Sequence, residues 1–600
     1  MSESDRDSPF AGELEAEPLP RLLRSVVEIN RVILENLLAG NDASATGTVS
    51  RDWDSWLKPW LGGLGPLASS FQQAQLGFWQ SLLAAVESVS GLTGGSSLQV
   101  VDDSRFRDPE WQRNPLLKQL VETYQRVCCS YLALAESQPL EPALKRRLRF
   151  QLRYLFDALA PSNFFLINPE ALRHFLESDG RSLVRGLENL AADLRRGRFG
   201  LSDESVFVVG DNLAATPGMV IYENHLIQLL HYRPRTPKVR SRPLLIVPPC
   251  INKFYILDLQ ARNSLVRYCL EQGFQLFLIS WVNPDRRHRD YGWDDYVEQG
   301  VVRAVEITRE ICGEVPVNTL GYCIGGTLLA CALALLRSRR RARWVSSATF
   351  LTTLLDFSSP GDLEVFIDER ILAGQEREAA ACGYVSGRDL FHTFSQLRAK
   401  DLIWTYVVNS YLKGLDPTPF DILYWNCDPV NLTPRFYHRL VRELYLENLL
   451  IVGKFKVGRV RVQLGRLHTP AYFLSTIDDH LVPWRNVFAG AAVFAGTREF
   501  VLGHGGHVAG VVNPPGKKKS FYLVGDRPEG GAEAWREKAQ KYSGSWWDHW
   551  RRWLARRSGG WMAAPAVCGS RAHPPRDPAP GSYVKQRIDF AAADNKEAAD

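Results

Sequence analysis

The sequence lacks the features that would place the chain in a membrane, a disulfide scaffold or a zinc site. The apolar run Leu328–Leu336 is too short to span a bilayer and is interrupted by small residues. Residues 1–18 are acidic and have neither the basic nor the apolar region of a secretory signal. The ten cysteines are scattered and form no C-x-x-C pair. We therefore expect a protein of the reducing cytoplasm, with no metal site.

Charge and composition exclude further classes. The net charge of +6 is modest for 600 residues, so it favours acidic or phosphorylated ligands only weakly and does not indicate nucleic-acid binding. No repeat of fixed period is present. A chain of this length with 45% hydrophobic residues has ample material for a core and is expected to form more than one domain.

Changes in composition divide the chain into four parts. Residues 1–20 are predicted to be a disordered acidic tail. Helical spacing over 21–200 predicts an all-α N-terminal domain. From 201 to 556 short apolar runs alternate with helical segments, which predicts the catalytic domain. Residues 557–600 are expected to form a mostly irregular C-terminal tail.

The alternating segments predict an α/β fold with a parallel sheet covered on both faces. The predicted strands are PLLIVPP, QLFLISW, VNTLGYC, ATFLTTLLD, PAYFLSTIDDH and REFVLGHGGH. A long, mostly helical insertion separates the fourth of these strands from the fifth. At this point of such a fold an insertion lies over the carboxyl ends of the strands, so we interpret residues 357 to about 440 as a cap over the site.

The stretch GYCIGG, residues 321–326, predicts a nucleophile elbow. Gly321 and Gly325 flank Cys323, and only small flanking residues tolerate the sharp turn from strand to helix. The positive end of the helix dipole favours a thiolate at the central position. The alternative is a buried apolar cysteine in a helix-packing turn, because free cysteine is often buried.

An acid and a base follow in the order that α/β-hydrolases use. STIDDH offers Asp478 and Asp479 after one strand, and the spacing does not decide between them. GHGGHVAG offers His504 and His507 after the next, and we choose His507 because its glycine-rich loop could hold the ring over Cys323. His504 is expected to be structural or exposed to solvent.

Two backbone N–H groups complete the predicted site. Ile324 follows the nucleophile, and Cys250 lies in the loop PPCINKFY after an early strand, so both are candidate oxyanion donors. A thiol that attacks a thioester keeps the acyl group activated for a second transfer. A cysteine at the elbow therefore favours an acyltransferase that uses coenzyme A thioesters over a lipase.

The sequence closely resembles the polyhydroxyalkanoate (PHA) synthases from about residue 105 to 555. The form GYCIGGT and the length resemble the class I enzymes. By this resemblance Cys323 is the nucleophile, His507 the base and Asp479 the acid. The shared blocks include RFRDPEWQRNPL, INPEAL, PPCINKFYILDLQ, SWVNPD, GWDDY, GYCIGGT, FDILYWNCDPVNL, DDHLVPW, GHVAGVVNPP and GSWWDHW.

The resemblance also implies substrates and partners. The expected reaction joins short-chain (R)-3-hydroxyacyl-CoA units, foremost 3-hydroxybutyryl-CoA, into a polyester and releases coenzyme A, with no cofactor and no metal. A homodimer, association with polyester granules and contacts with granule-coat proteins are expected, and no nucleic acid. Arg398 is a candidate for a coenzyme A phosphate and Trp425 for the substrate site. For Arg398 a solvated helix surface, and for Trp425 a place in the core, are the plain alternatives.

Two other functions compete with this interpretation. A cysteine-nucleophile α/β-hydrolase acting on esters or thioesters would share the fold, but the large cap and N-terminal region argue against a small hydrolase. A non-catalytic granule-coat protein needs an amphipathic surface and no triad. The release of coenzyme A together with an insoluble product would separate the polymerase from both.

Overall fold

The computed structural model describes residues 103–516, 519–525 and 531–590. The predicted acidic tail 1–20 and the predicted helices before residue 103 lie outside the described residues. The chain divides into two compact units. One consists of the chain up to Leu201 together with Arg398–Pro417, and the other of Ser202–Leu397 and the chain from Thr418 onward. No helix in the described part is long and apolar enough to cross a membrane.

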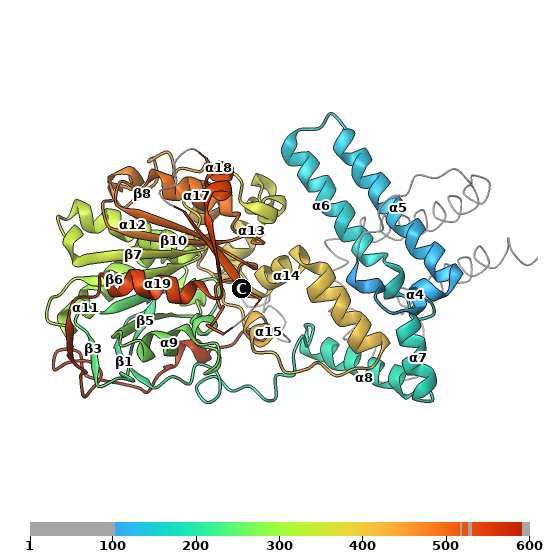
Figure 1. Ribbon diagram of the computed structural model, residues 1–600, viewed down its shortest axis with the longest axis horizontal. Helices are drawn as coiled ribbons and strands as arrows, with labels where there is room; N and C mark the ends of the chain where they lie inside the picture. Colours follow the sequence, from blue (N-terminus) through green and yellow to red (C-terminus); the bar gives the residue numbers. More distant parts are fainter. Residues whose placement is uncertain (1–102, 517–518, 526–530, 591–600) are drawn as a thin grey trace, which may run out of the picture. The chain divides into compact units, whose positions relative to one another are not determined.

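The first unit is helical, as the residue spacing predicts. Asn114 caps the longest helix by accepting hydrogen bonds from the N–H groups of its first turn, and Pro115 begins it, where a missing N–H costs nothing. Trp111, Leu120 and Tyr124 form the centre of its core. From residue 103 onward its α-helices are α4 (Glu110–Arg113), α5 (Pro115–Ser137), α6 (Pro142–Ala158), α7 (Pro169–Glu177) and α8 (Arg181–Arg196) (Figure 1).

The segment Arg398–Pro417 packs into the helical unit although it lies within the predicted cap. The buried carboxylate of Asp193, on α8, accepts hydrogen bonds from the hydroxyl groups of Tyr406 and Tyr411. Lys400 forms an ion pair with Asp103 at 2.9 Å. These contacts explain why the segment belongs to this unit, which the sequence pattern did not predict.

The second unit is built on a ten-stranded mixed sheet. Its order is β1 (Gly218–Glu223), β2 (Ile227–Tyr232), β5 (Leu276–Trp281), β4 (Leu244–Val247), β6 (Val317–Tyr322), β7 (Val345–Leu351), β10 (Ala471–Thr476), β11 (Arg498–Gly503), β12 (Phe521–Gly525) and β13 (Gln540–Ser543). The six strands from β5 to β11 are mutually parallel, and the two pairs at the edges are antiparallel. The six predicted strands are these six and are parallel as predicted, whereas the antiparallel strands at the edges were not predicted.

Helices cover both faces of the sheet. β4 is buried at every position, with Leu245 and Val247 facing one core cluster and Leu244 and Ile246 the other. The first cluster includes α11 (Arg303–Ile311), α12 (Ile324–Ser338) and α17 (Trp484–Val493), and the second includes α9 (Leu265–Glu271) and α19 (Trp546–Ala555). This two-sided burial is why the parallel strands read as continuous apolar runs.

The insertion after β7 is mostly helical. It contains α13 (Glu369–Cys382), α14 (Gly387–Leu397), α15 (Asp421–Asn426), α16 (Pro434–Arg439) and the π-helix η10 (Leu440–Leu446). The remaining α-helices in the described part of this unit are α10 (Trp293–Asp295) and α18 (Ala532–Lys538). The small pairs β3 (Lys238–Arg240) with β14 (Trp561–Ala563), and β8 (Lys456–Val457) with β9 (Val460–Arg461), complete the strands described.

The C-terminal segment returns to the edge of the sheet. The Val220 N–H of β1 donates to the carbonyl of Asp577. Gln228, on β2, accepts hydrogen bonds from the N–H groups of Ser582 and Tyr583. A segment that is irregular in conformation is thus tied down along β1 and β2.

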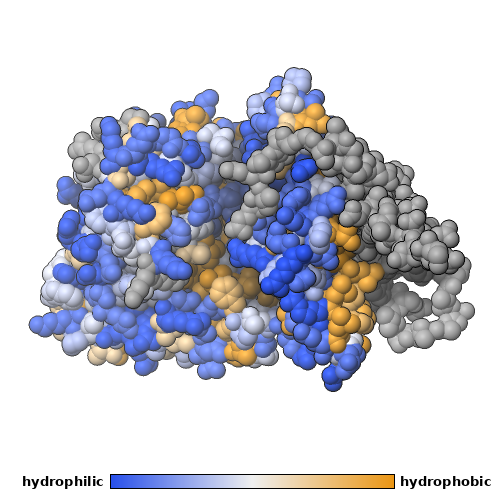
Figure 2. All heavy atoms as spheres, turned by 45° about the vertical axis from the view of Figure 1, so that its right-hand side comes forward, coloured by the Kyte–Doolittle hydropathy of each residue, from blue (hydrophilic) through white to orange (hydrophobic). Residues whose placement is uncertain are grey.

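Hydrophilic side chains dominate the visible surface of the molecule, with apolar patches between them (Figure 2).

Candidate active site

Cys323 occupies a strained turn between β6 and α12. Its φ of 52° and ψ of −126° lie outside the regions that L-residues ordinarily adopt. The Cys323 N–H donates to the Leu351 carbonyl at 2.9 Å, which holds the turn against β7. The side chain is partly exposed while both neighbours are buried. This is the predicted elbow, and the buried-cysteine alternative does not describe it.

The glycines around Cys323 are required by close backbone contacts. A Cβ on Gly325 would lie 2.3 Å from the Val247 carbonyl oxygen and 2.5 Å from that of Pro248. A Cβ on Gly321 would lie 2.4 Å from the Cα of Gly326. Real Cβ atoms do not approach other atoms so closely, so the elbow tolerates only glycine at these positions.

We expect Gly325→Ala to lower the free energy of unfolding by about 2–4 kcal/mol, because the methyl group meets backbone that cannot move aside. Gly374→Ala, in α13, is the matched control, since nothing lies within 4 Å of its Cβ position. That change should be neutral or slightly stabilising. Urea denaturation of both variants measures the difference. Equal stability of the two would contradict the close contact.

His507 and Asp479 meet beside the elbow. His507 follows β11, Asp479 follows β10, and these strands are parallel neighbours, so both residues leave the same edge of the sheet. The Nδ1 atom of His507 lies 2.7 Å from Oδ2 of Asp479. The other carboxylate oxygen accepts from the N–H groups of Leu481 and Val482 at 3.0 and 2.8 Å. Asp479 is therefore fully engaged and fixes the orientation of the imidazole.

The electrostatics of His507 favour its charged form. Burial alone lowers the pKa of His507, but the charge of Asp479, the charge of Cys323 and hydrogen bonds to both raise it well above its ordinary value. The positive charge on His507 is thus stabilised by two neighbours, Asp479 and Cys323. The arrangement is suited to moving a proton from the thiol to His507.

The alternatives within each motif lie outside this arrangement. Asp478 is exposed, whereas the side chain of Asp479 is fully buried. His504 is also exposed and packs against the ring of Phe521. The structure therefore brings together Cys323, Asp479 and His507 and leaves the other two aside.

The predicted oxyanion donors lie next to the nucleophile. Ile324 is the first residue of α12, and the first N–H groups of a helix have no partner within it. Gly325 lies against Val247 and Pro248, so the loop that carries Cys250 packs on the elbow. Burial raises the pKa of the Cys250 thiol, and the nearby Cys323 adds to this rise. That these two N–H groups together hold an oxyanion stays a prediction.

Aromatic side chains support the loop that carries His507. The Tyr322 ring stacks on the imidazole with centroids 5.6 Å apart, and its hydroxyl donates to the His507 carbonyl. The indole N–H groups of Trp546 and Trp547, on α19, donate to the carbonyls of Gly510 and Val511 at 2.9 Å. The tryptophans at helical spacing in WWDHWRRWL predict core packing, which is correct. Their hydrogen bonds to the loop have no local signal in the sequence.

Comparison with known proteins decides the family. Residues 102–269 match the family described as "Poly-beta-hydroxybutyrate polymerase (PhaC) N-terminus", and residues 243–514 match "alpha/beta hydrolase fold". Over 553 residues the chain is 41% identical to the "Poly(3-hydroxyalkanoate) polymerase subunit PhaC" of Cupriavidus necator, covering 91% of this chain and 92% of the relative. The chain belongs to the poly(3-hydroxyalkanoate) polymerase family.

Other members of the polymerase family match over similar lengths. The PhaC subunit of Rhizobium etli is 40% identical and covers 87% of this chain and 82% of its own. The "Poly(3-hydroxyalkanoate) polymerase" of Methylorubrum extorquens is 39% identical and covers 90% of both chains. The resemblance stated from the motifs and the prediction of an α/β-hydrolase core are therefore confirmed.

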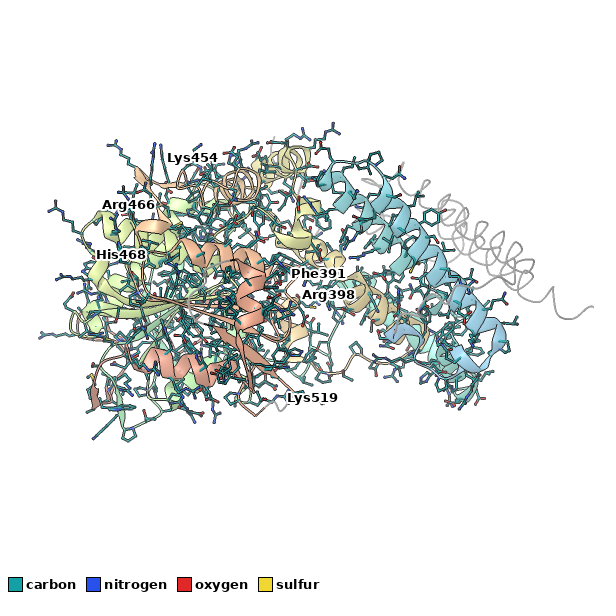
Figure 3. All side chains as sticks on the ribbon, turned by 45° about the horizontal axis from the view of Figure 1, so that its top comes forward. Phe391, Arg398, Lys454, Arg466, His468 and Lys519 are labelled. Carbon is teal, nitrogen blue, oxygen red and sulfur yellow. The ribbon has the colours of Figure 1, made fainter. Side chains whose placement is uncertain are left out.

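The two substrate-binding candidates of this polymerase occupy different units. Arg398 (Figure 3) lies in the helical unit, half exposed, and forms an ion pair with Asp401. Trp425, on α15, is only 6% exposed, and its indole N–H donates to the carbonyl of Lys253 at 2.7 Å. Trp425 is therefore a core aromatic that also holds the loop after β4. A contact of either residue with substrate stays a prediction.

Proposed function

We propose that this chain polymerises (R)-3-hydroxyacyl-CoA into polyhydroxyalkanoate through acyl thioesters of Cys323. The observation that carries the proposal is a strained, partly exposed cysteine at the start of α12, next to a buried His507–Asp479 pair. Membership of the polymerase family supplies the substrate class. A hydrolase would use the same fold, but no relative reported above is named as one.

Acylation of the enzyme is the first step. His507 takes the thiol proton, and the Cys323 sulfur attacks the carbonyl carbon of the hydroxyacyl-CoA. The N–H groups of Ile324 and Cys250 hold the negative charge that develops on the carbonyl oxygen. The bond to the coenzyme A sulfur breaks, and the departing thiolate receives the proton from His507. One thioester has replaced another at nearly equal energy, so the acyl group stays activated.

Elongation forms an oxygen ester from a thioester. The 3-hydroxyl group of one unit attacks the thioester carbonyl of a chain held on a cysteine, and His507 accepts the hydroxyl proton. The carbon–sulfur bond breaks and the thiolate recovers the proton. No redox step and no metal enter this scheme, and coenzyme A is released once for each unit added.

The function is tested with the purified full chain and (R)-3-hydroxybutyryl-CoA. We expect free coenzyme A to accumulate together with an insoluble polyester that yields 3-hydroxybutyrate only after alkaline hydrolysis. A longer substrate, (R)-3-hydroxydecanoyl-CoA, is the control for the short-chain preference and should react more slowly. Stoichiometric release of soluble 3-hydroxybutyrate without polymer would support the hydrolase instead.

Asp479→Asn is expected to slow acylation and elongation by a similar factor, roughly 10²–10⁴. Both oxygens of Asp479 are already occupied by His507 and by two backbone N–H groups, which leaves the carboxylate in an orienting role. Single-turnover coenzyme A release measures acylation, and steady-state polymer formation measures elongation.

Asp478→Asn is the control for this change, because Asp478 is exposed and should tolerate the change at both steps. A much larger loss in elongation than in acylation for Asp479→Asn would show that the carboxylate acts on the attacking hydroxyl.

A homodimer and association with polyester granules and their coat proteins are further parts of the proposal, supported by the family resemblance alone. Light scattering of the purified chain at several concentrations tests the dimer. A monomeric mass at every protein concentration, both with and without substrate, would contradict the proposed dimer.

A further inference from the structure

The loop between β4 and the 3-10 helix η3 (Phe254–Leu257) carries Cys250 and is held by the α15 region. Trp425 donates its indole N–H to the Lys253 carbonyl at 2.7 Å. Asn252 and Pro429 pair as an isolated antiparallel β-bridge. The backbone of this loop, which supplies one proposed oxyanion donor, is thus bonded to the segment that follows α15.

A buried ion pair joins the same two segments. The Nζ atom of Lys253 lies 2.6 Å from Oδ1 of Asp428, and the side chains are only 4% and 1% exposed. The other carboxylate oxygen accepts a hydrogen bond from the Tyr255 hydroxyl at 2.9 Å. Burial lowers the pKa of Lys253, which the neighbouring carboxylate partly offsets.

Such a pair is a poor source of net stability, because removing both charges from water costs about as much as their attraction returns. The ion pair instead restricts the conformation of the loop backbone. A lysine amine reaches a buried carboxylate only when the intervening backbone is in one place, and here that backbone is three residues from Cys250. An apolar pair would leave the loop more freedom to shift.

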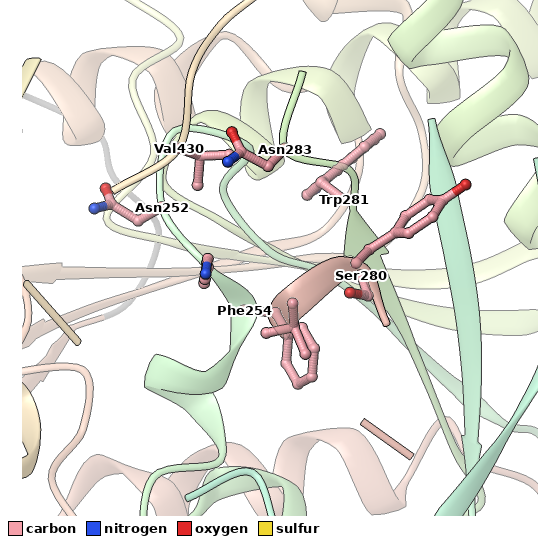
Figure 4. A pocket seen from close by; sticks show the side chains of 9 residues that line it. Asn252, Phe254, Ser280, Trp281, Asn283 and Val430 are labelled. Carbon is pink, nitrogen blue, oxygen red and sulfur yellow. The ribbon is translucent and has the colours of Figure 1, made fainter. Parts of the chain in front are cut away.

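The surroundings leave the loop little room. A cavity of only about 10 Å³ remains between Asn252 and Lys253 on one side and the end of β5 on the other (Figure 4). Ser280, Trp281 and Val430 also line it. Trp281 donates its indole N–H to the Pro248 carbonyl at 2.9 Å, which fixes the other end of the loop.

Arg587 of the C-terminal segment lies next to the pair. It is 38% exposed, lies 3.6 Å from Oδ1 of Asp428 and forms an ion pair with Glu204 at 3.1 Å. Its guanidinium also lies over the Tyr424 ring of α15, 5.1 Å from the centroid. Two positively charged groups, Lys253 and Arg587, thus lie close to two negatively charged groups, Asp428 and Glu204.

We propose that Lys253 is a positioning residue whose ion pair with Asp428 fixes the Cys250 N–H where the oxyanion forms. This inference rests on the proposed function, because it assigns Cys250 a role in acylation. It predicts that loss of the pair slows attack on a thioester carbonyl without harming the thiol itself. The two effects can be separated because the Cys323 thiol lies at the start of α12, whereas the Cys250 N–H lies in the loop after β4.

The test uses the double variant Lys253→Met/Asp428→Asn in the full chain. Neutralising both partners avoids the unpaired buried charge that a single change would leave, so the chain should fold. Two rates are measured: coenzyme A release in a single turnover of (R)-3-hydroxybutyryl-CoA, and alkylation of Cys323 by iodoacetamide. Alkylation attacks a saturated carbon and creates no oxyanion, so it reports on the thiol alone.

We expect acylation at saturating substrate to fall 10- to 100-fold, with alkylation within twofold of the wild type and little change in the half-saturating concentration. The control is Arg339→Met/Glu298→Gln, which removes another ion pair of this unit and should change neither rate. Acylation within threefold of the wild type, or an equal fall in both rates, would overturn the assignment. A wild type that never acylates Cys323 would instead contradict the proposed function.

Discussion

Cys323→Ala is expected to abolish both coenzyme A release and polymer formation while the chain stays folded. The change removes only the sulfur at a partly exposed position, so it leaves at most a small cavity and does not alter the backbone of the elbow. The only other thiol placed in the site, that of Cys250, is buried, and burial raises its pKa, so it is not expected to replace Cys323 as the nucleophile. Intact-mass spectrometry after mixing with (R)-3-hydroxybutyryl-CoA should show an acylated wild type and an unmodified variant.

The Cys323→Ser variant tests whether the reaction needs a thiol at this position or also proceeds with an alcohol. An alcohol is a weaker nucleophile than a thiol at neutral pH, and an oxygen ester holds the acyl group in a stable form. We expect slow acylation, and an ester that persists in the mass spectrum without polymer. Normal turnover by a folded Cys323→Ala chain would end the assignment of this residue.

His507→Ala should lose about as much activity as Cys323→Ala, because the members of a triad act as a unit. Without the imidazole neither the thiol nor the attacking 3-hydroxyl has a base, so both steps fail. Alkylation of Cys323 by iodoacetamide should also fall at neutral pH, since His507 no longer holds the thiol proton. Rapid-quench assays of coenzyme A release, compared with the wild type, measure the loss.

His504→Ala is the matched control, because His504 lies in the same glycine-rich loop but is exposed and has no proposed catalytic role. It should keep near-normal rates. If His504→Ala proves as damaging as His507→Ala, the loop acts through its conformation and the assignment of the base is wrong.

The sequence predicts the centre of the fold well, for a physical reason. β5, β4, β6, β7, β10 and β11 are buried on both faces, so each is a short apolar run bounded by polar or turn residues. The elbow has its own local signal in the glycines around Cys323. Strand order then brings Asp479 and His507 to the same edge.

The edges of the sheet could not be predicted in this way. β2 contains His231 and Gln228 inside a buried strand, and these polar residues break the apolar run HLIQLLHY. β13 is exposed throughout and shows no apolar alternation at all. Both edge pairs join strands that are close in the sequence, β1 with β2 and β12 with β13, but their mixed polar and apolar residues give no continuous apolar run to mark them.

Contacts between distant residues are the other gap. Lys253 and Asp428 form an ion pair across 175 residues of sequence, and neither residue lies in a motif that indicates its partner. The segment that begins at Arg398 groups with the helical unit because Tyr406 and Tyr411 bond to Asp193, more than two hundred residues earlier. Such pairs follow from the fold and become visible only once it is known.

The hydrogen bonds that tie the C-terminal segment to β2 have a consequence for synthesis of the protein. Gln228 meets Ser582 across 354 residues of sequence. At ribosomal rates of about 5–20 residues per second, Ser582 is made roughly 20–70 s after Gln228. During that time α19, which supports the His507 loop, is also unmade. Until Trp546 and Trp547 have been made, the loop that carries His507 lacks the two indole hydrogen bonds that hold it, so the site of a nascent chain is completed only late in synthesis.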